Sequence, residues 1–437
     1  MPDDMSTKPS QSHGRSSEIP ALALNLIRLT IIGSCVGILS GVASAIFLLS
    51  LSAATNYRES HSNLLYLLPA AGALIGLIYS TYGKSVDAGN NLVLETVHDP
   101  NGSIPFRMAP LVLVTTVLTH LFGGSAGREG TAVQMGGALA ALLRKPLRLD
   151  RKDFRIVVMS GISGGFGSVF GTPVAGTVFG LEVLTLGRMS YEAIIPCLAA
   201  SVVGDIVCRA LGVQHHLYVV QPIQQLSGKM WLAVILAGVA CAGTAAAFSE
   251  LTHSISALTK KYLKSGWARP VIGGTLIIAL TLALKSRAYL GLGLPLIEQS
   301  FQQHGVPYTA FAIKILFTAI TLGTGFKGGE VTPLFCIGAT LGAALAHVIG
   351  VPCDLFAALC FVGVFAGAAN TPVACIVMGM ELFGSSLAVP LATVCIISYQ
   401  LTGHRGIYLS QRVHTAKAES LTSVTGNTLR EYRTREP

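Results

Sequence analysis

The chain has 437 residues, of which 51% are hydrophobic and only 12% are charged, and its formal net charge is +9. Soluble domains carry about 25% charged residues, so this composition argues against a large soluble helical protein, whose outer faces would need charge. The basic residues are scattered, with no aromatic platform interleaved among them, which argues against nucleic-acid binding. The composition predicts a polytopic protein of the lipid bilayer.

Both ends of the chain are polar. Residues 1–22 form a predicted polar tail without the apolar segment of a cleavable signal peptide, and residues 411–437 form a second polar, basic tail. Lys and Arg favour the cytoplasmic side of a membrane. We therefore expect both termini in the cytoplasm of a multi-pass protein of the cell (inner) membrane.

Long uncharged stretches fill the chain between the tails. An apolar stretch of about 18 residues or more can span a bilayer. The stretches without Asp, Glu, Lys or Arg are 29–57, 60–83, 108–127, 156–181, 230–249, 331–353, 355–380 and 382–404. Shorter ones predict tilted, broken or partly buried helices: 193–204, 271–284 and 315–326. The pattern predicts an all-α fold with roughly ten to sixteen helical segments.

Small residues punctuate these stretches. The glycine-rich stretch 161–171 predicts close packing between helices, because small residues allow transmembrane helices to approach one another. Nine cysteines stand singly, mostly inside apolar stretches such as those around Cys35 and Cys241, and no CxxC pair occurs. We expect buried thiols, without a disulfide framework and without a zinc site.

The chain repeats itself. Residues 171–184 and 370–383 are identical at seven of fourteen positions with an offset of 199, and residues 123–131 match 324–332 at four of nine positions with an offset of 201. The matches divide the chain into predicted halves at 23–222 and 229–410. Repeats of this kind in membrane proteins place the substrate near the bilayer midplane, where the halves meet.

Three glycine-flanked breaks precede predicted helices. Their cap-type residues are Asn90, Thr131 and Thr332, and Pro333 suits the first turn of a helix. A helix N-terminus carries unpaired N–H groups and roughly half a positive charge. Several such ends converging at one point would bind an anion without a full cation.

Glu129 is the sharpest candidate residue. It lies between an uncharged stretch and a helix start, and a carboxylate at membrane depth costs about 2.5–3.5 kcal/mol, so such a group is normally functional. Ionised Glu129 would occupy the anion site, and protonated Glu129 would leave it, which would couple a proton to an anion. The alternative is a structural ion pair between Glu129 and Arg128 at a helix cap.

Three further glutamates recur in the repeat. Glu330 matches Glu129 by the sequence alignment and is a candidate accessory residue, with the same structural alternative. Glu182 and Glu381 match each other near predicted helix ends. We expect this second pair to tie helix ends to neighbouring loops.

The ordered set of motifs resembles the CLC family of chloride channels and anion/proton antiporters. GREGT at 127–131 is similar to the family's GREGP motif, GGEVTP at 328–333 to its GGxFxP motif, and Gly89-Asn90-Asn91 stands at the place of its GSGIP motif. Gly406-Ile407-Tyr408 fits the family's pore tyrosine. The resemblance covers about residues 23–410, in order.

The resemblance implies a CLC-type inverted repeat with many tilted and broken transmembrane helices, assembled as a homodimer with one pore per subunit. It implies that Glu129 is the external gate and that Tyr408 and Asn90 close the inner side. It also implies an anion held by Gly130, Val331 and Thr332, the last two through backbone amides. We expect no metal, nucleotide or covalent cofactor.

The departures from the family pattern are similar to its fluoride/proton antiporter branch. Asn90 replaces the central serine, Thr131 replaces a proline, Val331 follows Glu330 in place of a phenylalanine, and Val183 stands where many exchangers have a proton-accepting glutamate. An Asn amide offers more N–H donors than a serine hydroxyl does, which suits strongly hydrated fluoride. A CLC-type chloride channel or chloride/proton antiporter is the alternative, because Val183 also fits CLC channels.

An enzyme is a more distant alternative. Gly161-Ile-Ser163-Gly164 and Ala346-His347-Val-Ile-Gly350 are similar to the GxSG and AHxxG patterns of rhomboid intramembrane serine proteases. Rhomboids lack an internal repeat of this length, and both fragments lie in glycine-rich predicted helices. We therefore expect a transporter, with a small anion, protons and the lipid bilayer as its partners.

Overall fold

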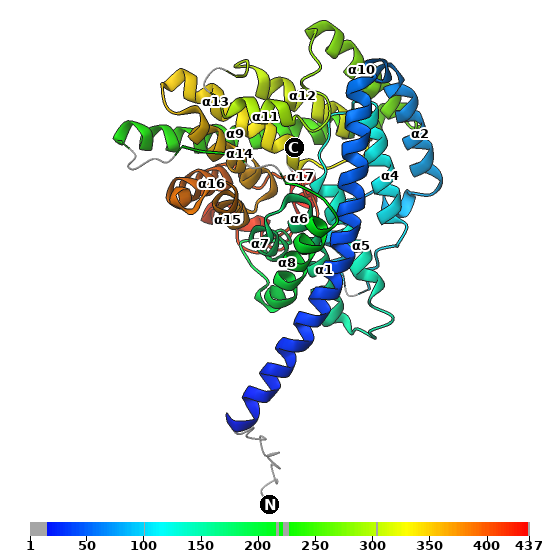
Figure 1. Cartoon of the computed structure of the whole chain (residues 1–437), viewed down its shortest axis with the longest axis vertical. Coiled ribbons are helices and arrows are strands. Elements are labelled where there is room, and N and C mark those ends of the chain that lie inside the picture. The colour runs from blue at the N-terminus through cyan, green and yellow to red at the C-terminus, as the bar shows by residue number, and fades with distance from the viewer. Residues whose placement is uncertain (1–14, 100, 216–217, 222–226, 303–304, 436–437) are drawn as a thin grey trace, which may run out of the picture.

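The computed structural model describes residues 15–99, 101–215, 218–221, 227–302 and 305–435, which form a helical body with one two-stranded sheet in this part of the chain (Figure 1). The helices of the first half are α1 (Arg15–Ser60), α2 (Leu68–Thr81), α3 (Asn90–His98), α4 (Met108–Leu121), α5 (Glu129–Leu142), α6 (Arg151–Phe170), α7 (Pro173–Glu182) and α8 (Ile194–Ala210). Short 3-10 helices join them at η1 (Ser62–Leu67), η2 (Lys84–Val86) and η3 (Tyr191–Ala193).

The second half has the same order of helices. They are α9 (Gly228–Tyr262), α10 (Ala268–Leu284), α11 (Leu294–Ser300), α12 (Ala310–Gly323), α13 (Val331–Ile349), α14 (Cys353–Ala369), α15 (Pro372–Phe383) and α16 (Ala388–Thr402), with η4 (Ser385–Leu387) before α16. α1 begins inside the segment predicted as a polar tail, and α9, the counterpart of α1, begins at Gly228.

Equivalent points of the two halves touch each other. The N–H of Gly127 donates to the carbonyl of Gly329 (2.6 Å), and the N–H of Gly329 donates to the carbonyl of Gly127 (2.9 Å), as an isolated antiparallel bridge. Such an exchange between matching residues is the signature of a local twofold axis. The axis passes between the residues just before α5 and just before α13.

Two of the predicted spans are each broken into two helices. The stretch 156–181 is divided at Gly171, which ends α6 with φ +78°, and the stretch 355–380 is divided at Asn370, which ends α14 with φ +55°. The left-handed conformation is open to glycine and, among other residues, favours asparagine. Charge alone does not reveal these breaks, because apolar residues continue on both sides of each one.

The close helix packing predicted for residues 161–171 is confirmed. A Cβ added at Gly161 would lie 2.4 Å from the carbonyl oxygen of Gly136, so α6 and α5 approach through backbone alone. The second half repeats this device, since a Cβ at Gly338 of α13 would lie 2.2 Å from the carbonyl oxygen of Cys360 in α14. α6 and α14 are buried along nearly their whole lengths and form the centre of the body.

Six segments in the described ranges are long and apolar enough to cross a bilayer: 18–60, 62–81, 191–210, 228–262, 331–349 and 385–402. The first turns of α1 project beyond the rest of the body (Figure 1). Cys35 of α1 is exposed, unlike the other eight cysteines, so the prediction of a buried thiol is wrong at this position. The reason is that α1 packs inward with one face and leaves the other apolar face uncovered.

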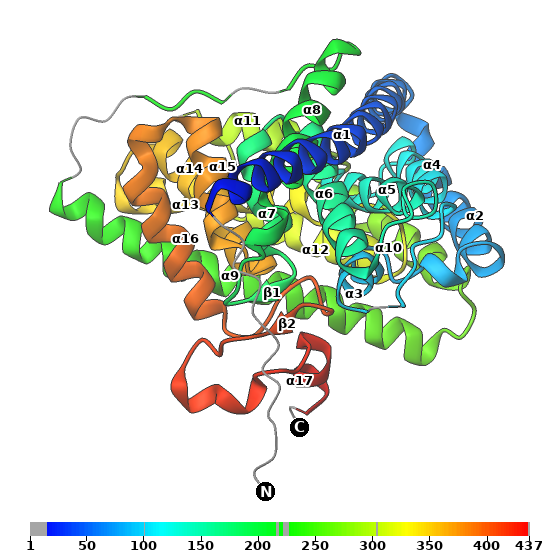
Figure 2. The same cartoon turned by 90° about the horizontal axis from the view of Figure 1, so that it is seen from below.

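The C-terminal residues fold against the helical body. Strand β2 (Arg412–Val413) pairs in parallel with β1 (Thr185–Leu186), and η5 (Glu419–Val424) and α17 (Leu429–Arg435) follow. A small core joins Leu186 to Val413, Val424 and Leu429. Figure 2 shows this C-terminal segment, residues 411–435, gathered with β1 on one side of the body. The predicted polar tail therefore contains ordered structure.

Candidate anion site

Two helix N-termini meet at the axis between the halves. The Gly127–Gly329 bridge holds the backbone just before α5 and α13, so the first residues of these helices face each other. A side chain at Gly127 would lie 2.8 Å from the Pro333 ring, which leaves glycine as the residue that fits. The predicted convergence of helix starts is present for α5 and α13.

The Glu129 carboxylate crosses to the N-terminus of α13. It is fully buried and accepts hydrogen bonds from the backbone N–H of Thr332 (3.0 Å) and from the Thr332 hydroxyl (2.7 and 2.6 Å to its two oxygens). An unpaired N–H at a helix start is the group that binds free anions in other proteins. The carboxylate therefore occupies the place of an anion.

Arg128 also contacts the same carboxylate. Its Nε lies 3.4 Å from one oxygen of Glu129, and its backbone N–H donates to the other oxygen at 3.3 Å. The structural alternative predicted for Glu129 is therefore present alongside the anion-like contact. The Thr332 bonds are the shorter ones, so they fix where the carboxylate lies.

The structure corrects the alignment of Glu330 with Glu129. The backbone bridge pairs Gly127 with Gly329, which makes Glu330 the counterpart of Arg128, and Val331 the counterpart of Glu129. The sequence alignment was one residue out of register because it matched the two glutamates. Glu330 stands at the N-cap of α13 and is half-buried, and its buried Oε2 has no hydrogen-bond partner among the described residues.

Asn90 lies beside these groups. A Cβ added at Gly130 would be 2.8 Å from Asn90 Nδ2 and 3.5 Å from Glu330 Oε2, so the amide, the glycine and the carboxyl group form one cluster. Asn90 is buried, and its Oδ1 has no hydrogen-bond partner in the described part of the chain. α3 thus brings a third helix start to the site.

Tyr408 is buried in the segment that follows α16. The segment is anchored by the N–H of Ile407, which donates to Ala368 (2.9 Å), and by the N–H of Ser410, which donates to Oδ1 of Asn91 (2.9 Å). The Ser410 hydrogen bond places this segment beside the start of α3, which carries Asn90. The structure therefore brings together Asn90, Glu129, Gly130, Glu330, Val331, Thr332 and Tyr408, which are the predicted site residues.

An aromatic wall beyond Glu129 was missed by the sequence analysis. Arg128 and Thr332 line a cavity of about 10 Å³, with room for the centre of roughly one water molecule. Its other walls include Phe170, Phe335 and Phe361, and the rings of the last two stack at 4.3 Å. No spacing rule finds this wall, because its rings come from separate helices.

Gln134 is a further polar residue near the site that the sequence analysis did not single out. It is buried in α5, and its amide nitrogen would lie 3.4 Å from a Cβ added at Gly89, just before Asn90. A single amide within an apolar helix was the signal that could have found it.

Glu182 and Glu381 form the predicted structural pair. The Glu182 carboxylate accepts from the N–H groups of Val373 (3.1 Å) and Ala374 (2.8 Å) at the start of α15. Glu381 accepts from the N–H groups of Val174 (3.0 Å) and Ala175 (2.7 Å) at the start of α7. Each therefore caps the start of the helix that carries the other. The geometry is that of a structural pair, but the groups they join are helix N-termini, where the sequence analysis expected neighbouring loops.

The structure does not support the protease alternative, because Ser163 and His347 are not hydrogen-bonded to each other. The Ser163 hydroxyl is buried in α6 with no hydrogen-bond partner among the described residues, and it packs against Gly180 of α7. His347 lies in α13 with its Nδ1 3.0 Å from the Cys353 sulfur. No hydrogen bond joins Ser163 to His347, so the two fragments do not form a serine–histidine pair.

Comparison with known proteins identifies relatives across most of the chain. A family model described as voltage gated chloride channel matches residues 71–403. A chloride/fluoride channel protein of Pseudomonas syringae pv. tomato is 51% identical over 388 residues, which is 87% of this chain and 86% of the relative. A H(+)/Cl(-) exchange transporter of Vibrio vulnificus is 24% identical over 441 residues, with 90% and 91% covered.

Solved structures agree with these sequence relatives. The crystal structure of a CLC-type fluoride/proton antiporter superposes with a TM-score of 0.86 at 33% identity, covering 89% of this chain and 99% of the other. A slow cyanobacterial Cl-/H+ antiporter has a TM-score of 0.77 at 16% identity, covering 94% and 99%, and supports the fold alone. These findings confirm the resemblance predicted from the motifs and the predicted fold class.

Proposed function

Because this chain belongs to the voltage gated chloride channel (CLC) family, we propose that it transports fluoride across the membrane in exchange for protons. The most similar relatives described above carry chloride/fluoride or fluoride/proton in their names. The six long apolar segments fit an integral membrane protein. The residues around Glu129 supply a physical route for the exchange.

The observation that carries the proposal is the place of the Glu129 carboxylate. It accepts both the backbone N–H and the hydroxyl of Thr332 at the start of α13, so it competes directly with an anion for the same donors. Protonation removes the charge that these donors bind and frees them for fluoride. The departure of fluoride then lets the deprotonated carboxylate return, so one side chain couples the two ions.

The cluster opposite Glu129 supports fluoride as the ion. Asn90 and Glu330 each present a buried oxygen without a donor among the described residues. A buried acceptor without a partner is costly, and a proton on the unpartnered oxygen of Glu330 would turn that acceptor into a donor. Protonated Glu330 and the Asn90 amide would then be two donors for a small, strongly hydrated anion. Glu330 is therefore our candidate for a second proton-carrying group.

The remaining assignments complete the proposal. Tyr408 closes the inner side, and the backbone of Gly130, Val331 and Thr332 contacts the anion. We place the protein in the inner membrane with both termini in the cytoplasm, where the basic tails favour them. We assign it a homodimeric assembly by the family resemblance. We assign it no enzymatic activity, because the relatives described above are named as a channel, an exchange transporter and an antiporter.

The test is ion efflux from proteoliposomes. Purified protein is reconstituted with fluoride or chloride inside, and an ion-selective electrode and a pH electrode follow the external solution together. Fluoride efflux much faster than chloride efflux, with proton uptake in a constant ratio to fluoride, is expected. Chloride as fast as fluoride would assign the protein to the chloride branch. Transport of neither ion, with liposomes shown to be intact, would contradict the proposal.

A further inference from the structure

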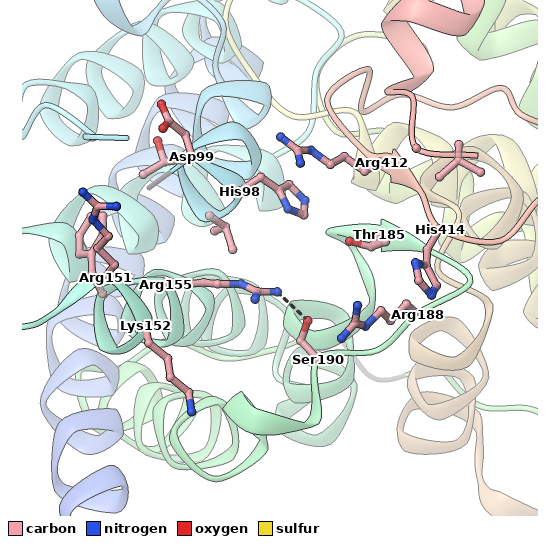
Figure 3. Close-up of a pocket in the computed structure, with 15 residues that line it drawn as sticks. His98, Asp99, Arg151, Lys152, Arg155, Thr185, Arg188, Ser190, Arg412 and His414 are labelled. Atoms are coloured by element: carbon pink, nitrogen blue, oxygen red, sulfur yellow. Dashed lines mark hydrogen bonds between the residues drawn. The ribbon is translucent and has the colours of Figure 1, made fainter. Parts of the chain in front are cut away.

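A second concave site lies away from the anion path, where α3 ends, α6 begins and the C-terminal segment packs (Figure 3). Its volume is about 560 Å³, which is within the range of small-molecule sites. Five cationic side chains from three segments, α6, the connection after β1, and β2, line it: Arg151, Lys152, Arg155, Arg188 and Arg412. Figure 3 shows Arg155, Arg188 and Arg412 reaching toward one central space, with Arg151 and Lys152 at its edge.

The positive charge of this pocket is largely uncompensated. Asp99 is the acidic residue among its described lining residues. The side chains of Arg151, Lys152, Arg188 and Arg412 have no hydrogen bond or ion pair with any described residue. Like charges this close repel one another, so an anionic ligand would stabilise the arrangement.

Arg155 is positioned and still has a free donor. Its Nη1 pairs with Glu192 (3.0 Å) and its Nη2 donates to the Ser190 hydroxyl (3.2 Å), while its buried Nε has no partner among the described residues. Burial lowers the pKa of the neighbouring His98 imidazole, and the charges of Arg412 and Arg155 lower it further. The imidazole therefore experiences a positive potential from the pocket.

A second basic pocket has a volume of about 430 Å³ and is lined by Lys84, Lys260, Arg269 and Lys327. There, Lys327 pairs with Asp87 at 2.6 Å and lies 3.9 Å from the centre of the Tyr79 ring. The other three cations have no hydrogen bond or ion pair with a described residue, as in the first pocket. The first pocket differs in the kind of cation, because four arginines line it and a single arginine lines the second.

We propose that the pocket formed by α6, the α7–α8 connection and β2 binds a phosphate-bearing anion. Arginine guanidinium groups match phosphate oxygens with paired N–H donors. The source is either a soluble phosphorylated molecule or the headgroup of an anionic lipid, which present the same chemistry. A bound phosphate would join Arg412, four residues after Tyr408, to Arg155 of α6, and so fasten the C-terminal segment to the helical body.

The experiment has two arms, both on the purified full-length chain. Inorganic pyrophosphate is titrated in an uncharged detergent by calorimetry, and cardiolipin retained from mixed phosphatidylcholine nanodiscs is counted by native mass spectrometry. The variants are Arg188→Gln and Arg412→Gln, which break no described side-chain contact. Lys264→Gln, an exposed cation outside the pocket, is the matched control for charge.

We expect each arginine variant to weaken binding about tenfold, as loss of one charge-assisted hydrogen bond would, and Lys264→Gln to leave it unchanged. Arg412→Lys should retain part of the binding, which separates lost charge from failed folding. Binding of pyrophosphate supports a soluble ligand, and selective retention of cardiolipin supports a lipid headgroup. Binding of neither, or binding that is indifferent to both arginine variants, overturns the proposal.

Discussion

Two pairs of glutamates lie across the same twofold axis, and they differ in how their carboxyl groups are hydrogen-bonded. Glu182 and Glu381 are in register, and each accepts two backbone N–H groups from the start of the other's helix. Glu129 and Glu330 are one residue out of register: Glu129 is fully hydrogen-bonded, and Glu330 has an oxygen without a described partner. The symmetric pair stabilises the fold by capping two helices, whereas the asymmetric pair leaves a carboxyl oxygen of Glu330 without a described hydrogen-bond partner at the proposed anion site.

The largest expected effect is the loss of proton coupling when Glu129, of the asymmetric pair, can no longer titrate. Glu129→Gln keeps the size of the side chain and removes its titration, so proton uptake coupled to fluoride should fall to the liposome background. Simultaneous fluoride and pH recording from proteoliposomes measures this. Glu59→Gln, at an exposed carboxylate, is the matched control and should keep the wild-type ratio. A Glu129→Gln protein that still takes up protons in proportion to fluoride would show that Glu129 does not carry the coupled proton.

The next effect should appear in stability. Glu182→Gln replaces a charged acceptor of two backbone N–H groups with a neutral amide, and should lower the free energy of unfolding by on the order of 2–3 kcal/mol. Glu381→Gln should cost less, because Glu381 is more exposed. Thermal unfolding in detergent measures both. The folded fraction should keep its proton-to-fluoride ratio, and a changed ratio would show that this pair is not merely structural.

A smaller effect concerns the donors that Glu129 shares with the anion. Thr332→Val, made in the Glu129→Gln background so that no carboxylate competes, should weaken fluoride binding by up to about tenfold through loss of one hydroxyl donor. Calorimetric titration of fluoride into the purified variants measures the affinity, and Thr332→Ser should retain it. Equal affinity in the Val and Ser variants would mean that the hydroxyl serves the carboxylate alone.

A further expected effect concerns the pH dependence of stability and a half-buried lysine of the C-terminal segment, which lies outside the repeat. Lys417 of the C-terminal segment donates to Asn370 Oδ1 (2.7 Å) and to the carbonyl of Tyr399 (2.6 Å), and burial lowers the pKa of its amine to about 7. The unfolded amine titrates near 10.4, so between these values the unfolded chain binds more protons than the folded chain. Stability should therefore rise with pH across this window.

Lys417→Met tests that slope. The variant should show a flatter dependence of unfolding temperature on pH above about 7 than the wild-type chain, measured in detergent by thermal unfolding. Lys264→Gln, at an exposed lysine, should keep the wild-type slope. A slope that survives in Lys417→Met would mean that other groups set the pH dependence of stability.

The sequence contained most of this architecture, and what it missed has identifiable physical causes. Apolar stretches and the repeat indicated a helical membrane fold, but not the breaks at Gly171 and Asn370, because side-chain polarity does not change where the backbone turns. The repeat located both glutamate pairs. It misaligned Glu330 with Glu129, since identity was scored on side chains while the register is set by the Gly127–Gly329 backbone bridge.

The site was predictable where it depends on local motifs. The glycine-flanked breaks indicated where α3, α5 and α13 begin, and Glu129 follows from the cost of a charge at membrane depth. The predicted cap residues were wrong, because Asn90, Thr131 and Thr332 lie inside the helices. The N-caps are Gly89, Arg128 and Glu330, and none of them caps its helix through a side chain. The aromatic wall and the ordered C-terminal segment were not predictable in this way. Their contacts join residues far apart in the chain, such as Leu186 and Val413, and no periodicity records such pairs.

The Gly127–Gly329 bridge also limits how the molecule can alternate its access to the two sides. A cycle in which the halves rocked apart at this point would break two backbone hydrogen bonds where lipid and packed side chains exclude water. Each unsatisfied group would then cost several kcal/mol. The two hydrogen bonds of the bridge therefore hold the backbones of the two halves together at this point. For the proposed exchange, the bridge predicts that torsional swings of individual side chains such as Glu129 carry the gating motion, while the backbone of the two repeats stays together.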